Sequence, residues 1–309
     1  MNNYVLLIGG ANIDIQGFSY KKFIFKDSNP GSIKISCGGV SRNIAENLAR
    51  LSLNAKLITA LGDDDFGNRI LKNGESTHID FSHSLMLKDK PTSTYLSILN
   101  AHGEMITAIS DMSILDNITM EFLNKKDAIL KNSLLTVLDC NLSYDVLECL
   151  TSKYTNIPFF LDTVSSKKAA RVKDIIGRFH TIKPNKLECE ILSGIKINKR
   201  DDAKRASEYF LKKGVKQVFI SLAKDGLFYS DGCSEGFIDK IAVKPVNTTG
   251  AGDAFVAGLV YSYIKSFSIE YAAKFGLAAS LIAIESEDTV NPNISVMQIE
   301  NKMLEANLC

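Results

Sequence analysis

The sequence predicts an α/β protein built on a mostly parallel sheet, and three observations lead to this fold class. From residue 134 onward, short apolar runs alternate with segments of helical spacing, as they do when helices connect parallel strands. The chain has 309 residues, 45% of them hydrophobic, so it can bury a large core. It contains no repeat, low-complexity segment or linker, and we expect residues 1–309 to form one domain.

Hydrophobic spacing places the individual elements of this body. In the N-terminal part we expect a buried strand at 5–8 that ends at Gly9-Gly10, a helix at 42–51, a strand at 55–61 and a helix that opens at 66–72. Further along we expect strands at 134–138, 159–161, 181–182 and 217–221, helices at 144–154, 169–179, 187–193 and 201–213, and an almost wholly apolar helix at 254–264.

Two β-rich excursions, residues 12–37 and 92–109, interrupt the pattern of the body. In the second excursion, the β-favouring runs 94–99 and 105–109 flank a five-residue turn, which is the signature of a hairpin. Short strands that cannot form a core alone usually pair with each other. We therefore expect the excursions to form a small sheet, a lid, over one end of the body.

Composition and charge exclude several classes of protein. The 36 basic and 35 acidic side chains give a net charge of +1, too little to attract nucleic acid. The six cysteines form no C-x-x-C pair, which favours a reducing cytoplasm over a disulfide framework. No signal peptide or membrane span is apparent. We expect a cytoplasmic protein with neither a nucleic-acid nor a membrane partner.

The strongest local pattern is the segment 247–253, directly before the apolar helix. Gly250, Ala251 and Gly252 would present backbone amides at a helix N-terminus, where the dipole favours an anion. Asp253 lies in the first turn, where a carboxylate can accept a proton from a hydroxyl that attacks a phosphoryl group. Helix capping would explain either feature alone. Together with the buried helix, the two features favour a phosphate site, although no P-loop motif occurs.

Two further segments are suited to holding a sugar. Gly38 and Gly39 open the first helix and allow a ligand close to the backbone, and Asn43 can hydrogen-bond vicinal hydroxyls. An ordinary glycine turn is the alternative. Asn12 and Asp14 follow the first strand, at the edge of an α/β sheet where ligands bind.

Two more segments are suited to holding a nucleotide. Asn185 and Glu188 are three residues apart at a helix start, where they either organise Mg²⁺ and phosphate or form a capping box. Residues 221–226 lie between two predicted strands and form either a simple hairpin turn or a nucleotide-phosphate loop. The four histidines have neither metal-ligand nor catalytic-triad spacing.

This combination resembles the ribokinase-like, or PfkB-type, family of carbohydrate and nucleoside kinases over essentially the whole chain. The three family motifs are matched, in order along the chain, by Gly38, Gly39, Asn43, Ala45, Ser52 and Gly62, by Asn185 and Glu188, and by Thr248 to Asp253. The resemblance implies a three-layer α/β/α body with a small β-sheet lid. It also implies phosphoryl transfer from ATP, with Mg²⁺, to a small-molecule acceptor.

The resemblance assigns roles to single residues. Asp253 would be the catalytic base, and the amides of Gly250, Ala251 and Gly252 would form the anion hole. The ribose would be held by Asn12, Asp14, Gly38, Gly39 and Asn43. The nucleotide would be bound by Asn185, Ser221, Ala223, Lys224 and Gly226, and Glu188 would face the metal ion.

Segments 27–31, 38–49, 94–97, 139–141 and 180–185 further resemble the subgroup of the family that phosphorylates the 5′-hydroxyl of pseudouridine. The family motifs say little about the base, and the candidates for recognising it are Ser28, Asn29, Thr94 and Asn141. Relatives often pair through the lid, which implies a homodimer. A sibling kinase acting on ribose, inosine or adenosine, a non-catalytic ligand sensor, and a nucleic-acid-binding regulator are the alternatives.

Two residues depart from the family pattern. Asn247 stands where the family often has Asp, and an amide is a weaker ligand for a monovalent cation. Ala223 stands where Gly is common in the nucleotide loop, so its methyl group would crowd the phosphates. We therefore expect weak potassium activation and a slightly narrowed nucleotide loop.

Overall fold

A large, mostly parallel sheet forms the middle of the molecule. The computed structural model describes residues 3–308, except for the side chain of Lys224. The strand order is β15 (Glu235–Ile238), β14 (Leu227–Ser230), β13 (Gln217–Ser221), β12 (Thr181–Ile182), β11 (Phe159–Asp162), β10 (Thr136–Asp139), β1 (Val5–Ile8), β4 (Ala55–Ile58) and β6 (Ile79–Asp80). From β13 to β6 every pairing is parallel, whereas β14 and β15 are antiparallel. The predicted α/β fold is confirmed.

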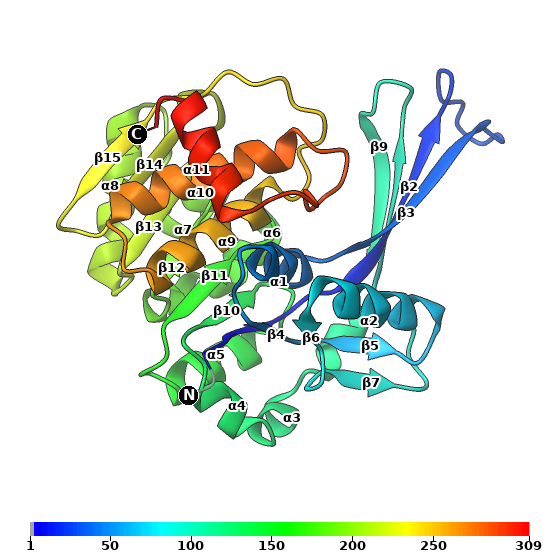
Figure 1. The fold of residues 1–309 in the computed structure, drawn as a ribbon, viewed down its shortest axis with the longest axis horizontal. Helices are drawn as coiled ribbons and strands as arrows, with labels where there is room; N and C mark the ends of the chain where they lie inside the picture. Colours follow the sequence, from blue (N-terminus) through cyan, green and yellow to red (C-terminus); the bar gives the residue numbers. More distant parts are fainter. Residues whose placement is uncertain (1–2, 309) are drawn as a thin grey trace.

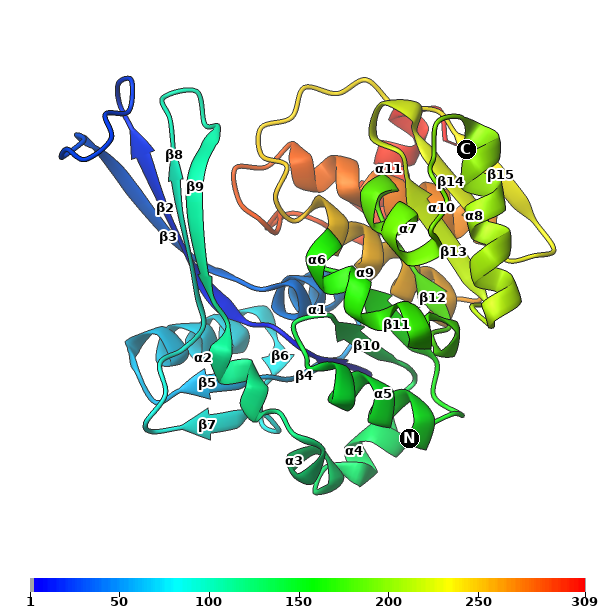
Figure 2. The same cartoon turned by 180° about the vertical axis from the view of Figure 1, so that it is seen from behind.

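Helices cover both faces of this sheet because its strands are apolar on both sides. In β1, Leu7 points into one core, while Leu6 and Ile8 point into the other. The first face is covered by α1 (Val40–Arg50), α2 (Asp65–Thr77), α9 (Ala251–Ile264), α10 (Ile269–Ile284) and α11 (Val296–Glu305) (Figure 1). The second face is covered by α3 (Met120–Asn124), α4 (Asp127–Lys131), α5 (Tyr144–Lys153), α6 (Ser166–Ala169), α7 (Lys186–Ser193) and α8 (Arg200–Lys213) (Figure 2).

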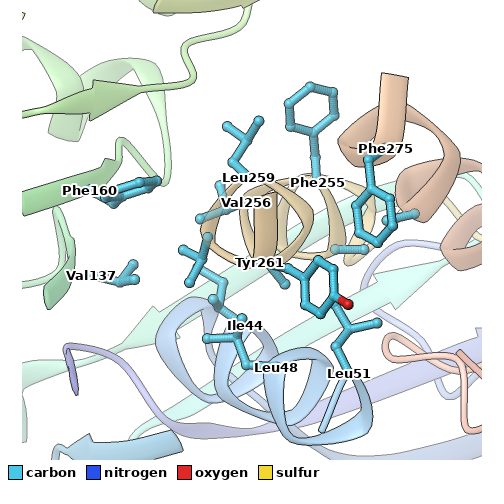
Figure 3. Close-up of a cluster of buried hydrophobic side chains, with 14 of the residues drawn as sticks. Ile44, Leu48, Leu51, Val137, Phe160, Phe255, Val256, Leu259, Tyr261 and Phe275 are labelled. Carbon is cyan, nitrogen blue, oxygen red and sulfur yellow. The ribbon is translucent and has the colours of Figure 1, made fainter. Parts of the chain in front are cut away.

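Helix α9 is buried in the first of these layers. Ile44 of α1 and Val256 of α9 belong to one cluster of buried side chains, part of which Figure 3 shows. On the side toward α10, a Cβ placed on Gly258 would lie 2.8 Å from the Cα of Gly276. The two glycines therefore let α9 and α10 approach closely, and the position of α9 is fixed between its neighbours.

The two β-rich excursions form a separate sheet in the order β3 (Gly31–Gly38), β2 (Asn12–Ser19), β8 (Thr94–Leu99) and β9 (Met105–Asp111). We call these four strands the lid sheet, and the small second sheet of the predicted fold class is thereby confirmed. Its outer part stands clear of the body in both views (Figures 1 and 2). One face carries Lys34, whose Nζ donates to the Glu287 carbonyl at 3.0 Å and pairs with Asp288 at 3.1 Å.

The structure departs from the predicted elements in several places. The strand expected at 55–61 is divided, because β5 (Ala60–Gly62) leaves the large sheet and pairs with β7 (Leu85–Leu87). The helix expected at 169–179 is the short α6 followed by a 3₁₀ segment, Ala170–Arg178. There Gly177 packs so closely on α8 that a Cβ would lie 1.9 Å from the Lys213 carbonyl oxygen. The predicted elements also stop at residue 264, whereas α10 and α11 follow it.

Candidate active site

Polar groups gather where five neighbouring strands of the large sheet end. β1 runs into Gly9, β10 and β11 end at Asp139 and Asp162, β12 precedes Lys183, and β13 ends at Ser221. Asp139 and Asp162 are directly paired in the sheet register. The carboxyl edge of a parallel sheet is where α/β proteins bind ligands. This edge is therefore the candidate site.

The Gly250 turn and Asp253 lie at the same edge, at the start of α9. Gly250 has a φ of 85°, and a Cβ there would be 1.9 Å from the carbonyl oxygen of Thr289, so only glycine fits. No side chain caps α9, which leaves the amides of Ala251 and Gly252 open toward the edge. The turn can therefore bind an anion through backbone groups.

Asp253 is buried, and its surroundings both oppose and support its charge. Burial, followed by the negative charge of Asp162, raises the pKa of Asp253 well above its usual range. The Asn43 Nδ2, which donates to Asp253 Oδ2 at 2.7 Å, and the Lys183 ammonium lower it. A raised pKa makes this carboxylate a stronger proton acceptor than an ordinary aspartate.

The residues predicted to hold a sugar converge at the base of the lid sheet. The Asn12 Nδ2 donates to Asp14 Oδ1 at 2.6 Å, and a Cβ on Gly38 would lie 2.1 Å from the other oxygen of Asp14. Gly39, with a φ of 100°, precedes α1 and touches the backbone of the β1–β2 turn. Thr94 is paired with Ile13 in the lid sheet, next to Asn12 and Asp14. The structure thus brings these residues together.

The residues predicted to recognise a base are divided. Lys168 donates to the amide oxygen of Asn141, and a Cβ on Gly10 would lie 2.7 Å from the Asn141 Nδ2, so Asn141 lies at the floor of the site. Ser28 and Asn29 are instead in the exposed loop between β2 and β3. There the Asn29 side chain is occupied with the backbone of Ile24. The structure does not place these two beside Asn141.

A mostly apolar cavity of about 510 Å³ borders the turn before α9. Its lining includes Ser221, Ala223 and Gly226 from the predicted nucleotide loop, Lys183, Thr248, Ala251 and Gly252 from the edge, and apolar side chains such as Ile241, Leu277 and Leu281. A cavity of this volume, with apolar walls and few polar groups, is typical of small-molecule sites. The Lys224 side chain lies outside the described part of the structure.

The predicted nucleotide loop is the turn of the β13–β14 hairpin. Ala223 has a φ of 51°, in the left-handed region that favours glycine, at the position where the family commonly has Gly. Asn185 forms a parallel bridge with Ser221, so the two predicted nucleotide segments are neighbours. The hairpin turn is confirmed, and the nucleotide role of residues 221–226 stays a prediction.

Asn185 and Glu188 form the capping box that was one of their two interpretations. Asn185 Oδ1 accepts from the Glu188 amide, and Glu188 Oε2 accepts from the Asn185 amide at 2.9 Å and from Thr163 Oγ1 at 2.8 Å. Within residues 3–308, no three His, Cys, Asp or Glu side chains are grouped to hold a metal ion. Mg²⁺ usually takes one or two carboxylates together with phosphates and waters, so Glu188 fits such a metal only when a phosphate ligand is also present.

Asn247 holds the turn before α9. Its Oδ1 accepts from the Thr249 amide at 2.9 Å, and its Nδ2 donates to the Glu287 carbonyl at 3.3 Å. The amide therefore directs a donor at that carbonyl, where an aspartate would present only acceptors.

Three residues of the site were not predicted from the sequence. Asp139 accepts from the amides of Gly10 and Ser41 and so ties β10 to the β1 turn and to α1. The charges of Asp162 and Lys183 act on the pKa of Asp253, which Asp162 raises and Lys183 lowers. Asp139 and Asp162 are the last residues of buried strands and Lys183 directly follows one, so the strand-end rule that singled out Asp14 would also have found them.

Comparison with known proteins identifies the class to which this fold and site belong. The model of the pfkB family carbohydrate kinases matches residues 2–295, and the chain belongs to this family. The pseudouridine kinase of Escherichia coli (strain K12) is 38% identical, over 96% of this chain and 95% of that protein. An uncharacterised sugar kinase of the same bacterium, YeiI, is 35% identical over 94% of this chain and 81% of that protein.

Solved structures agree with the fold. A crystal structure from Clostridium perfringens, of a protein described as a sugar kinase, has a TM-score of 0.88 and 41% identity and covers 98% of this chain and 96% of that one. The ribokinase of Arabidopsis thaliana, solved with ribose and ATP, has a TM-score of 0.83 at 18% identity, with 98% and 99% covered. Within residues 3–308, no helix is both long and apolar enough to cross a membrane.

Replacing Asp162 by asparagine should flatten the pH dependence of stability. Burial raises the pKa of Asp162 from 3.8 to about 6. Between these two pH values the folded protein keeps a proton that the unfolded chain has released. The associated stability is present at low pH and is lost as the pH rises through this window. Asp162→Asn removes this loss and still accepts the Val164 amide. Urea unfolding at pH 4 to 8 measures the slope. The exposed Asp116→Asn is the control, and equal slopes in both variants would contradict the assignment.

Proposed function

We propose that this protein uses ATP to phosphorylate the 5′-hydroxyl of pseudouridine, giving pseudouridine 5′-phosphate and ADP. The observation that carries the proposal is the place of Asp253. Its carboxylate accepts from Asn43, one of the residues predicted to hold the sugar. It also lies in the first turn of α9, an open helix N-terminus whose Ala251 and Gly252 line the 510 Å³ cavity. This is the arrangement that a kinase needs, because the acceptor hydroxyl and the γ-phosphoryl group must meet beside a base.

The residues of this chain divide the catalytic work. Asp253 takes the proton of the attacking hydroxyl. The amides of Gly250, Ala251 and Gly252 and the dipole of α9 stabilise the charge on the transferred group. Lys183 adds a positive charge, since a Cβ on Gly252 would lie only 3.7 Å from its Nζ. When bound, Mg²⁺ would neutralise phosphate charge, and Glu188 and Asn185 would hold it from the side of β13.

The choice of pseudouridine rests on the subgroup resemblance and on the 38% identity with a pseudouridine kinase. Asn141 supports it, because the Lys168 ammonium occupies its amide oxygen and so orients the Nδ2 donor. The 35% identity with a sugar kinase keeps a sugar acceptor as the second candidate. ATP, a free nucleoside and the six unpatterned cysteines together support a cytoplasmic location.

The acceptor is tested by ADP release with pseudouridine, uridine, inosine, adenosine, ribose and fructose. We expect kcat/KM for pseudouridine to exceed that for the other acceptors by at least ~100-fold, because unpaired polar groups penalise a wrong base. A preference for ribose or fructose would show that the protein is a sugar kinase and not a nucleoside kinase. If no acceptor leads to ADP release, the proposed kinase activity is wrong and the protein is better explained as a non-catalytic ligand sensor.

Asp253→Asn should lower kcat by at least ~100-fold, the usual effect of losing a positioned base. Asparagine keeps the size of the side chain and an oxygen that accepts from Asn43, so the substrate Kd should change little. Steady-state kinetics and calorimetric titration of the nucleoside measure the two quantities. Turnover near the wild-type rate would exclude Asp253 as the base.

We also propose that two copies pair through the outer face of the lid sheet. Ile35, Ile15, Leu96 and Ile109 lie side by side across its four strands, and Ile33 is 73% exposed. The opposite face carries Lys34 and turns toward the body. A second lid sheet, apolar on the same face, is an occupant of matching shape and chemistry.

The double variant Ile33→Lys/Ile109→Lys should convert the dimer into a monomer, because charges on the outer face would be buried without partners. Analytical ultracentrifugation at 1 to 100 µM (about the range of weak dimers) measures the mass. Met297→Lys replaces an equally exposed side chain on α11 and should leave the dimer intact. An unchanged dimer in the double variant would exclude this face.

A further inference from the structure

A buried network of hydrogen-bonded side chains leads from α1 to Asp253. The guanidinium of Arg42 donates to Asn43 Oδ1 from Nη2 at 2.7 Å and from Nε at 3.3 Å. The Asn43 Nδ2 then donates to Asp253 Oδ2 at 2.7 Å. Arg42 is only 2% exposed, and Asn43 and Asp253 are also buried, so solvent does not compete for these bonds.

The chemistry of the three groups fixes their orientation. A guanidinium has only donors, so Asn43 must present its oxygen to Arg42 and its NH₂ group to the carboxylate. Without Arg42, the amide could turn over and direct its oxygen at Asp253. That arrangement would replace an attractive contact with a repulsive one.

Arg42 is itself held in place. Its Nη1 donates to Glu46 Oε2 at 2.8 Å and to Asn73 Oδ1 at 2.6 Å. The other oxygen of Glu46 accepts from Arg50 Nη2 at 2.7 Å, and Arg50 Nη1 donates to the Pro292 carbonyl at 2.7 Å. Two arginines, each one turn of α1 from Glu46, therefore share one buried carboxylate, and Arg42 is the one that bonds Asn43.

We infer that Arg42 is a positioning residue that orients Asn43, so that one oxygen of Asp253 receives an N–H and the other stays available to the acceptor hydroxyl. The inference rests on the proposed function, in which Asp253 is the base. Hydrogen bonding to the charged form favours ionisation, and only the ionised carboxylate can accept a proton.

The bond from Asn43 acts within a mostly acidic environment. Asp162 of β11 and Asp139 of β10 face Asp253 and disfavour its charge, and Lys183 after β12 favours it. On the side of α1, Arg42 and Glu46 lie behind Asn43, and Asp14 of β2 lies within electrostatic reach of Arg42. Because burial and two carboxylates oppose ionisation, a correctly oriented donor has a large effect on the charge state of Asp253.

The test compares Arg42→Met with Arg50→Met. Each variant removes one ion pair with Glu46 and leaves the other, so Arg50→Met is the control for the loss of that ion pair. Arg42→Met additionally removes the bonds to Asn73 and Asn43. We expect Arg42→Met to lower kcat about tenfold, as for loss of a hydrogen bond to a charged group, with an unchanged KM for ATP. The acid limb of kcat against pH should move up by about one pH unit. Arg50→Met should leave kcat within about twofold and the pH profile unchanged.

A second measurement separates this inference from the proposed function. The pKa of Asp253 is read from carboxyl ¹³C NMR of the ligand-free protein, with Asp253→Asn to assign the resonance. A higher pKa in Arg42→Met than in wild type and Arg50→Met supports the inference even if no acceptor is phosphorylated. An unchanged pKa, or equal losses of kcat in the two methionine variants, overturns it. If the wild-type protein turns over none of the acceptors, the proposed function is overturned, but the inference about Arg42 is not.

Discussion

The burial of α9 is the constraint on which the site depends. A helix exposed on one face could tilt or slide, but α9 is enclosed by α1, by α10 and by the central sheet. The contact of Gly258 with Gly276 leaves no space for α9 to move toward α10. The first turn of α9 is therefore held at one point of the sheet edge. Its backbone amides and Asp253 keep their positions without any side-chain cap.

The strand ends supply the charges around this fixed point. Asp139 is used mainly as a structural acceptor, since it takes N–H groups from the β1 turn and from the start of α1. Asp162, Lys183 and, to a smaller extent, Asp139 also act on the pKa of Asp253. A row of acidic groups at one sheet edge is costly, and the lysine and the helix dipole offset the cost. The arrangement places a carboxylate of raised pKa beside a turn that is able to bind an anion.

The sequence was sufficient for features that local pattern determines. Short apolar runs, 5–8 and 159–161, located β1 and β11, and the glycines with Asp253 located the helix N-terminus. Contacts between distant segments were not accessible, because nothing in the local pattern records them. The bond between Asn43 and Asp253 joins residues 210 positions apart, and the division of the strand at Thr59 depends on pairing with β7. Asn185 and Glu188 show a further limit, since the same two residues suit a helix cap and a metal–phosphate site.

The residues at the base of the lid sheet combine two properties. Asn12 and Asp14 begin β2, and Gly38 and Gly39 link β3 to α1, so all four lie where the lid sheet joins the body. These are two of the joints between the lid sheet and the body, and a rotation of the lid sheet would use them as part of its hinge. A ligand held by the same residues would restrict their backbone torsions directly. In this molecule the binding of the acceptor and the stiffening of the hinge would be one physical event, with no intermediate segment needed to transmit it.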